Sequence, residues 1–223
     1  MAGAPIRFLF DYISHNAYLA WTQIGVIAAR AGREVEPEAV LFAGLLNHYR
    51  QLGPAEVPPK ARWMMLDVVR KARRLGVPIA PPATHPFNPL LALRVTHAAP
   101  AGEPRRKLID GLFRAVWGES RDPTDVAVVS RVATDAGLDG DALVAAASAE
   151  PAKSALREAT ERALRDGVWG VPSIVADGEI FWGYDDLAHL ELFLAERDPL
   201  RPGDAERFTS YSASARRRRP DEK

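Results

Sequence analysis

The sequence predicts an α/β fold in which strand-containing segments at the two ends of the chain enclose a long helical stretch. Three observations support this fold class. Near the start, a β-prone apolar run, a helical pattern and a second strand-like run follow one another. Near the end, two short apolar runs joined by Asp-Gly precede a last helix. Between these segments, the apolar residues follow helical spacing.

The N-terminal segment predicts a βαβ unit. Residues 6–12 form an apolar run, interrupted by only two charged residues, that is typical of a buried strand. Ser14, His15 and Asn16 supply helix-capping residues, and residues 17–31 carry apolar side chains at helical spacing up to Gly32. Residues 36–42 are the next predicted strand. Strand, helix and strand in this order favour parallel pairing.

The C-terminal segment predicts a hairpin followed by a helix. The short runs 173–176 and 179–182 are joined by Asp177-Gly178, a strong indication of a hairpin. Asp185 and Asp186 then stand where the N-cap and first-turn acids of a last helix belong. A Val-Pro pair precedes the first of the two strands. This order resembles the C-terminal half of a thioredoxin fold, in which a cis-proline faces the active site.

The middle of the chain predicts helices without a second βαβ pattern. Asp122 and Asp139 are the expected caps of two of these helices. The segment 76–89 contains five prolines and is predicted to be an ordered loop. The predicted helices are residues 60–75, 89–96, 103–117, 123–136, 139–147 and 152–165.

These patterns divide the chain into three parts. Residues 1–43 and 167–200 are predicted to form one α/β domain, residues 44–166 a helical insertion, and residues 201–223 a disordered tail. The run of four arginines at residues 216–219 is expected to be solvated, with contact to nucleic acid or membrane as the alternative.

Composition excludes several classes of function. The 223 residues contain no cysteine, which excludes disulfides, thiolate metal sites and Cys-x-x-Cys redox chemistry. Lys+Arg equals Asp+Glu, so net charge gives no general attraction to nucleic acid or acidic membranes. No apolar run approaches the roughly 20 residues that span a bilayer, and no secretion signal is recognised. We therefore expect a cytoplasmic protein that binds no metal, nucleic acid or membrane.

Four segments carry a resemblance to a known family: DYISHNAYLAW, KARWMMLDVVRKARRLGVP, PFNPLLALR and GVWGVPSIVADGEIFWGYDDLAHLELFL. In this order they resemble the 2-hydroxychromene-2-carboxylate isomerase and kappa-class glutathione transferase family. The resemblance spans residues 6–195 and implies a thioredoxin-like fold of the DsbA and kappa type, with a helical insertion between its βαβ and ββα halves. It also implies glutathione as cofactor and a homodimer.

The resemblance makes Ser14 the candidate catalytic residue. Ser14 directly follows the first strand and begins the first helix, where free backbone N–H groups and the helix dipole favour an anion. The family places the glutathione thiolate there, with the serine hydroxyl as a donor to sulfur. From the local pattern alone, Ser14 is a helix cap. His15 stands where the family has proline, and it is either an acid or base near neutral pH or an exposed loop histidine.

Further site residues follow from the same resemblance. Val171 and Pro172 would form a cis peptide bond, and the backbone of Val171 would pair with the cysteinyl backbone of glutathione. Asp185 would bind the γ-glutamyl ammonium, or else cap the last helix. Lys60 lies in the segment that offers a basic residue to a ligand carboxylate.

Three residues are candidates for a second-substrate pocket that also includes His15. Trp169 and Trp182 lie close to the Val-Pro turn and would wall an apolar pocket, although core packing is the commoner use of tryptophan. Asn88 precedes Pro89 and either approaches the pocket or caps a helix.

These residues predict a glutathione-dependent isomerase of an aromatic or conjugated carbonyl compound, in which the bound thiolate adds reversibly to the substrate. A kappa-like glutathione transferase uses the same thiolate but releases the adduct. A non-catalytic thioredoxin-like binding protein is the alternative from another class. A weaker one is an interaction module that acts through the basic tail.

Overall fold

The computed structural model describes residues 3–215, and a four-stranded mixed sheet in the order β2-β1-β3-β4 lies at its centre. β1 (Ile6–Phe10) pairs in parallel with β2 (Val35–Ala39) and antiparallel with β3 (Ser173–Ala176). β3 pairs antiparallel with β4 (Glu179–Trp182). The predicted βαβ and ββα units therefore share one sheet, in which β1 is an inner strand.

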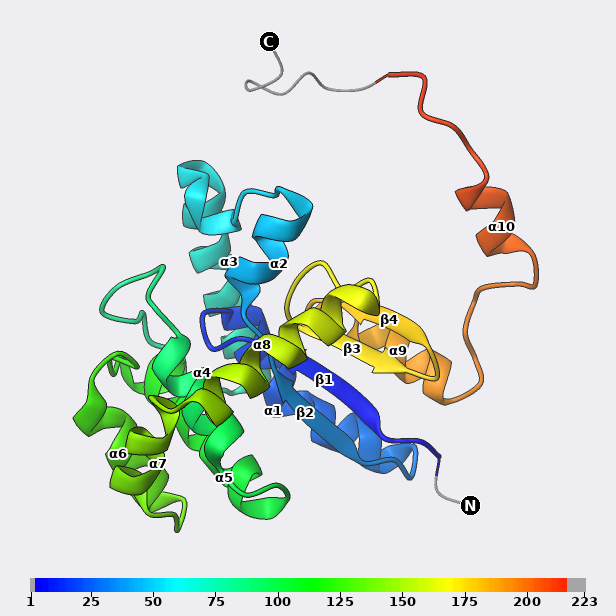
Figure 1. Ribbon diagram of the computed structural model, residues 1–223. Helices are drawn as coiled ribbons and strands as arrows, with labels where there is room; N and C mark the ends of the chain where they lie inside the picture. The colour runs from blue at the N-terminus through cyan, green and yellow to red at the C-terminus, as the bar shows by residue number, and fades with distance from the viewer. Residues whose placement is uncertain (1–2, 216–223) are drawn as a thin grey trace.

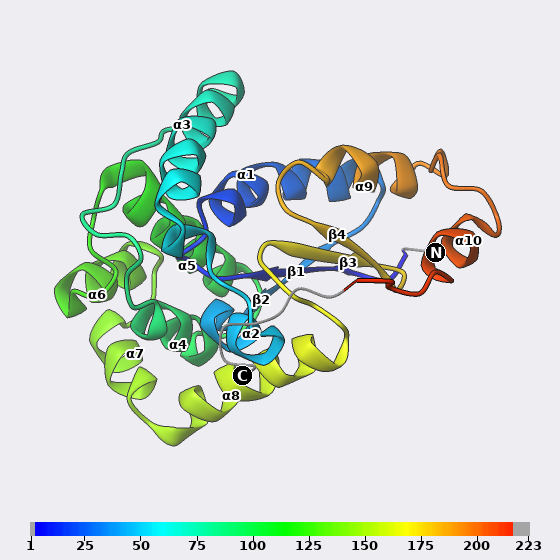
Figure 2. The same ribbon diagram turned by 90° about the horizontal axis from the view of Figure 1, so that it is seen from above.

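Helices cover both faces of this sheet (Figures 1 and 2). α1 (His15–Arg30) and α9 (Leu187–Leu194) lie on one face, and α8 (Glu150–Arg165) with α2 (Phe42–Tyr49) lies on the other. Because helices cover both faces of the sheet, the sequence of the inner strand β1 is an almost continuous apolar run and not an alternation of apolar and polar residues.

The helical insertion packs beside one end of the sheet (Figure 2). After a 3-10 turn (Pro54–Glu56), its helices are α3 (Pro58–Leu75), α4 (Leu90–Ala98), α5 (Glu103–Phe113), α6 (Val126–Asp135) and α7 (Gly140–Ala147). α5 continues into a π-helical turn (Arg114–Gly118). Their number and order agree closely with the sequence pattern.

Buried polar contacts fasten the insertion to the end of β1. The Trp117 indole Nε1 donates a hydrogen bond of 2.8 Å to the Tyr12 carbonyl oxygen. The Tyr12 hydroxyl lies 2.7 Å from Thr96 Oγ1, and both residues are buried. The Tyr18 hydroxyl donates to the Pro78 carbonyl at 2.7 Å, which holds the proline-rich loop against α1. The loop that follows β1 is thus fixed from several sides.

Two predicted features are wrong, the end of a strand and the cap of a helix. The expected strand 36–42 ends at Ala39, because Phe42 begins α2 and its backbone N–H donates to the buried Asp11 carboxylate at 3.0 Å. Asp122 does not cap α6; its carboxylate accepts a hydrogen bond from the Thr124 N–H, and Asp125 caps the helix through the Ala127 N–H. Asp139 caps α7 as predicted.

The C-terminal segment extends away from the body of the molecule in Figure 1. Within the predicted tail, α10 (Asp204–Thr209) forms a short helix, and almost all of residues 201–215 are exposed. The arginine run at residues 216–219 lies outside the described residues. Among residues 3–215, no helix is both long enough and apolar enough to cross a membrane.

Candidate active site

Ser14 occupies the N-cap position of α1. Its backbone is extended, and its Oγ accepts a hydrogen bond of 3.1 Å from the Ala17 N–H. The same hydroxyl donates to the Val171 carbonyl oxygen at 3.3 Å, which is long for an O–H···O bond. The predicted cap is therefore confirmed, and the Ser14 proton is only weakly engaged.

The Val171-Pro172 turn lies directly opposite Ser14. Its peptide bond is cis, as the family resemblance implied. The Pro172 carbonyl accepts a hydrogen bond from the Gly183 N–H at 2.9 Å, and Ser173 Oγ donates to the Gly170 carbonyl at 2.8 Å. Residues 157 positions apart in the chain thus meet at the N-terminus of α1.

The buried carboxylate of Asp11 holds the loop that leads into α1 and the start of α2. Its two oxygens accept hydrogen bonds from the backbone N–H groups of Ile13 and Phe42, at 3.1 and 3.0 Å. Burial raises the pKa of Asp11 from its ordinary value of 3.8 to about 7, although both hydrogen bonds act in the opposite direction. Sequence reasoning treated Asp11 only as an interruption of the first strand. An acid inside a buried run was the available indication of its role.

His15 is buried, so the interpretation as an exposed loop histidine is wrong. The residue is 3 % exposed, and its ring meets the Trp117 indole edge to face at 5.6 Å between centroids. Burial, with a smaller contribution from nearby His85, lowers the pKa of His15 to about 4. The imidazole is consequently neutral near pH 7 and does not titrate there.

Asp185 forms an ion pair with a residue that the sequence did not single out. The Lys71 ammonium on α3 lies 2.6 Å from an Asp185 carboxylate oxygen and 2.8 Å from Asp67. It also lies 5.4 Å from the centre of the Tyr184 ring. Partial burial opposes the charged ammonium, but the hydrogen bonds to Asp185 and Asp67 outweigh it and raise the pKa of Lys71.

Lys60, the predicted carboxylate-binding lysine, lies elsewhere on the same helix. It is exposed in the first turn of α3, whereas Lys71 lies in the last turns. At 1.5 Å per residue, the two positions are about 16 Å apart along the helix axis. Asp67 and Lys71 are spaced i, i+4, which could have indicated a local ion pair but not the contact with Asp185.

Trp169 and Trp182 form an aromatic pair beside the Val-Pro turn. Their ring centroids are 6.1 Å apart, and the residues are 36 % and 52 % exposed, so they are not core residues. Gly170 permits the pair, because a Cβ at this position would lie 2.6 Å from Trp182 Nε1. Asn88 lies one residue before Pro89, the N-cap of α4, and its side-chain oxygen accepts a hydrogen bond of 3.0 Å from the Leu90 N–H in the first turn.

An apolar cavity of about 290 Å³ lies between α3, the proline-rich loop and the π-helical turn. Trp117 forms one wall, and its indole also contacts His15 and His85, the latter at 5.5 Å between centroids. The other lining residues are Met65, Leu66, Val68, Val69, Ile79, Ala80 and Pro81. Trp169 and Trp182, the predicted pocket residues, do not line this cavity.

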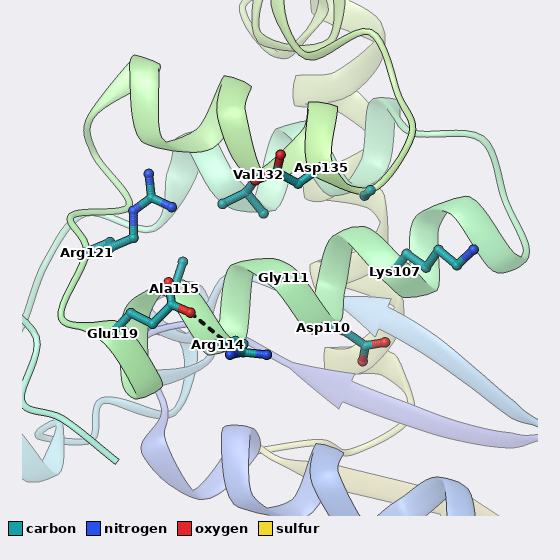
Figure 3. A pocket seen from close by; sticks show the side chains of 10 residues that line it. Lys107, Asp110, Gly111, Arg114, Ala115, Glu119, Arg121, Val132 and Asp135 are labelled. Atoms are coloured by element: carbon teal, nitrogen blue, oxygen red, sulfur yellow. Dashed lines mark hydrogen bonds and ion pairs between the residues drawn. The ribbon is translucent and has the colours of Figure 1, made fainter. Parts of the chain in front are cut away.

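A larger cavity of about 370 Å³ lies between α5 and α6, and charged side chains dominate its lining (Figure 3). Arg114 and Glu119 form an ion pair of 2.9 Å at its edge. None of its lining residues is a predicted site residue. The candidate site is the junction of Ser14 and Val171, and the apolar cavity is linked to it through Trp117, which lines the cavity and contacts His15.

The fold and this junction define a thioredoxin-like protein that carries a serine at the N-terminus of its first helix and a cis-proline opposite. Residues 5–195 match the family model described as a DSBA-like thioredoxin domain. The chain belongs to the DsbA-like thioredoxin family.

Similar proteins agree with the resemblance found in the sequence. A 2-hydroxychromene-2-carboxylate isomerase of Sphingobium xenophagum is 32% identical over 199 residues, covering 86% of this chain and 98% of the relative. Glutathione S-transferase kappa 2 of Caenorhabditis elegans is 25% identical, covering 88% and 95%. A solved 2-hydroxychromene-2-carboxylate isomerase structure superposes with a TM-score of 0.80 at 25% identity, over 86% of this chain and 94% of that chain. These relatives are named as enzymes.

Proposed function

We propose that this protein is a glutathione-dependent isomerase of a conjugated aromatic keto acid of the 2-hydroxychromene-2-carboxylate type. The observation that carries the proposal is the Ser14 hydroxyl, which caps α1 and lies 3.3 Å from the carbonyl of Val171, the residue before a cis-proline. A thiolate placed there meets a hydroxyl donor and the positive end of a helix dipole together.

The surrounding residues suit the rest of glutathione. The backbone of Val171 and Pro172 offers a strand-like edge to the cysteinyl unit. Asp185 and Lys71 carry opposite charges 2.6 Å apart, which complements the ammonium and carboxylate of the γ-glutamyl group. We assign this role to Lys71 in place of Lys60.

The chemistry of the relatives' named substrate fits a thiolate catalyst. 2-Hydroxychromene-2-carboxylate is a cyclic hemiketal, and its open form is a keto acid conjugated to a phenol. The thiolate adds to the carbon–carbon double bond, and the electron pair moves to the carbonyl oxygen to give an enolate. Rotation about the new single bond and expulsion of the thiolate restore the double bond in the other geometry. Glutathione is regenerated, which is covalent catalysis by a bound cofactor.

A transferase reaction is the second candidate, because kappa-class glutathione transferases are among the relatives. It uses the same thiolate with an electrophile whose adduct leaves the site. Turnover of 2-hydroxychromene-2-carboxylate without consumption of glutathione would distinguish the isomerase, whereas steady consumption with an aryl chloride would favour the transferase.

Ultraviolet titration of bound glutathione tests the proposal. We expect thiolate absorbance near pH 7 with the wild-type protein and a large loss of it in Ser14→Ala. Asp139→Ala is the matched control, because Asp139 caps α7 through the Ala142 N–H in the same way. This control should lower stability to a similar extent, about 1 kcal/mol, and leave the thiolate unchanged. Absence of glutathione binding at millimolar concentration would contradict the proposal and favour a non-catalytic protein.

A further inference from the structure

Within the part of the chain that the structure describes, His15 is a buried polar side chain whose ring nitrogens make no hydrogen bond, although the adjacent Asn16 side chain, whose oxygen is also unpaired, lies close enough to raise the pKa of His15 slightly. It is 3 % exposed, and neither ring nitrogen has a hydrogen-bond partner among residues 3–215. Buried polar atoms are nearly always paired, because leaving them unpaired forfeits the hydrogen bonds that they make with water. A phenyl ring would fill the same space without this cost. The imidazole therefore has a use that packing does not explain.

The position of His15 indicates what that use is. It directly follows Ser14 at the first position of α1, so it lies next to the place where the thiolate would sit. Its ring also contacts Trp117, which walls the apolar cavity. A substrate with an apolar body in that cavity and its reacting carbon at the sulfur would bring a polar group toward His15.

The surroundings of His15 keep its ring uncharged. Burial is the largest influence on its pKa, which falls to about 4; His85 from the proline-rich loop and Lys71 from α3 act in the same direction, and the side chains of Asn16 and Asp67 oppose them. A neutral imidazole offers one N–H donor and one acceptor nitrogen. It can hold a developing oxyanion by a hydrogen bond without surrendering its proton.

We propose that His15 donates a hydrogen bond to the carbonyl oxygen of the conjugated substrate and stabilises the enolate formed when the glutathione thiolate adds. This inference rests on the proposed function. The carbon–sulfur bond forms, the double-bond electrons move to the carbonyl oxygen, and that oxygen accepts the His15 N–H bond. On expulsion of the thiolate, the same electrons return and the carbon–sulfur bond breaks. No proton is exchanged, and His15 ends as it began.

The substrate class follows from the same geometry. A cavity of about 290 Å³ lies at the small end of ligand pockets, which suits a compact aromatic body. Its lining is almost wholly apolar, so the keto group of the substrate finds its donor at His15 and not within the cavity. The inference therefore selects compact aromatic compounds with a conjugated carbonyl.

His15→Phe tests the inference, with 2-hydroxychromene-2-carboxylate as substrate and glutathione saturating. We expect bound thiolate to remain at the wild-type level, because Ser14 is untouched, while kcat falls about a hundredfold, as when an oxyanion donor is removed. Binding of phenylpyruvate, a keto acid that cannot accept the thiolate by conjugate addition, should weaken only about fivefold, because a ground-state carbonyl gains less from the donor. His15→Asn, which keeps a donor, should recover part of kcat.

A control variant at an exposed histidine separates the role of His15 from the effect of the substitution itself. His48→Phe makes the same chemical change at an exposed position on α2 and should match the wild type. If the phenyl ring prevents folding, His15→Leu replaces it with the same expectations. The inference is wrong if kcat and phenylpyruvate binding of the folded variant lie within twofold of the wild type, or if thiolate is lost together with kcat. If the wild-type protein forms no thiolate, the proposed function itself fails.

Discussion

At the scale of single residues, we expect two lysines of α3 to contribute differently to glutathione binding. Lys71 is anchored between Asp67 and Asp185, whereas Lys60 is exposed in the first turn. We expect Lys71→Met to raise the KM for glutathione about tenfold with little change in kcat, because a charge-assisted contact contributes roughly 1.5–3 kcal/mol and exposure reduces it. Steady-state kinetics with varied glutathione measures this.

Lys60→Met is the matched control, since it removes the same charge from the same helix. Its KM for glutathione should equal that of the wild type. A larger effect at position 60 than at position 71 would return the carboxylate-binding role to Lys60.

Asp11 gives a prediction about pH. Its pKa is raised to about 7 in the folded protein from an ordinary value of 3.8. Since the folded state holds the proton more tightly, Asp11 contributes stability that is fully present below about pH 4 and is lost as pH rises through about 7. His15, with its pKa lowered to about 4, acts in the opposite direction, as do His85 and His97.

The difference between wild type and Asp11→Asn isolates this contribution. Denaturant unfolding at a series of pH values should show the wild type losing stability relative to the variant between about pH 4 and pH 7. The variant also loses one of two backbone hydrogen bonds, since an amide has a single acceptor oxygen. Losing that hydrogen bond lowers the free energy of unfolding of the variant by the same amount at every pH, so the dependence of stability on pH is unchanged. A difference that is constant with pH would mean that folding does not raise the pKa of Asp11.

The residues of the junction were predictable where a local pattern marked them. Ser14 follows a strand and begins a helix, and Val171-Pro172 precedes a hairpin, so both could be placed from sequence. Lys71 and Trp117 could not, because their roles depend on contacts with Asp185 and Tyr12, which are 114 and 105 residues away. Burial of His15 likewise depends on the insertion and not on its own helix.

At the scale of elements, the contact between α6 and α7 depends on Gly140. A Cβ at this position would meet the Ser130 carbonyl oxygen far inside van der Waals distance. Gly140→Ala is expected to lower the free energy of unfolding by at least about 2 kcal/mol, because backbone atoms must move apart. Thermal and denaturant unfolding measure the change.

Gly25→Ala provides the contrast within α1. A Cβ there meets nothing within 4 Å and the position is exposed, so the change should stabilise the protein by about 0.5–1 kcal/mol. Equal effects at the two glycines would contradict the packing described for α6 and α7.

Helix starts were predicted well only where the cap is local. Ser14 and Asp139 each bond an N–H three residues ahead, and both were identified from sequence. α2 was missed because its first N–H is satisfied by Asp11, which lies 31 residues earlier, while its N-cap residue is Leu41. When a distant residue accepts the hydrogen bond of the first helical N–H, the sequence next to the helix contains no capping residue to indicate its start.

At the scale of the whole molecule, the predicted division at residues 43 and 167 does not separate two cores. One apolar cluster includes Phe10 of β1, Phe113 of α5, Val129 of α6 and Leu190 of α9. We therefore expect a single cooperative unfolding transition, with coincident tryptophan fluorescence and far-ultraviolet circular dichroism curves.

An isolated fragment of residues 44–166 provides the complementary test. Without the buried partners supplied by the sheet, it should lack cooperative unfolding. Two separate transitions in the full chain, or a stably folded fragment, would show that the insertion is an independent domain.

The sheet order has a consequence for synthesis on the ribosome. β1 gains its parallel neighbour β2 early, but its other edge stays open until β3 emerges, and the Ser14–Val171 contact spans 157 residues. At 5–20 residues per second, translation needs about 8 to 30 s to cover that distance. For this interval the nascent chain exposes an unpaired apolar strand edge, the kind of surface that attracts chaperones or neighbouring chains. The junction of Ser14 and Val171 is therefore among the last features of the protein to be completed.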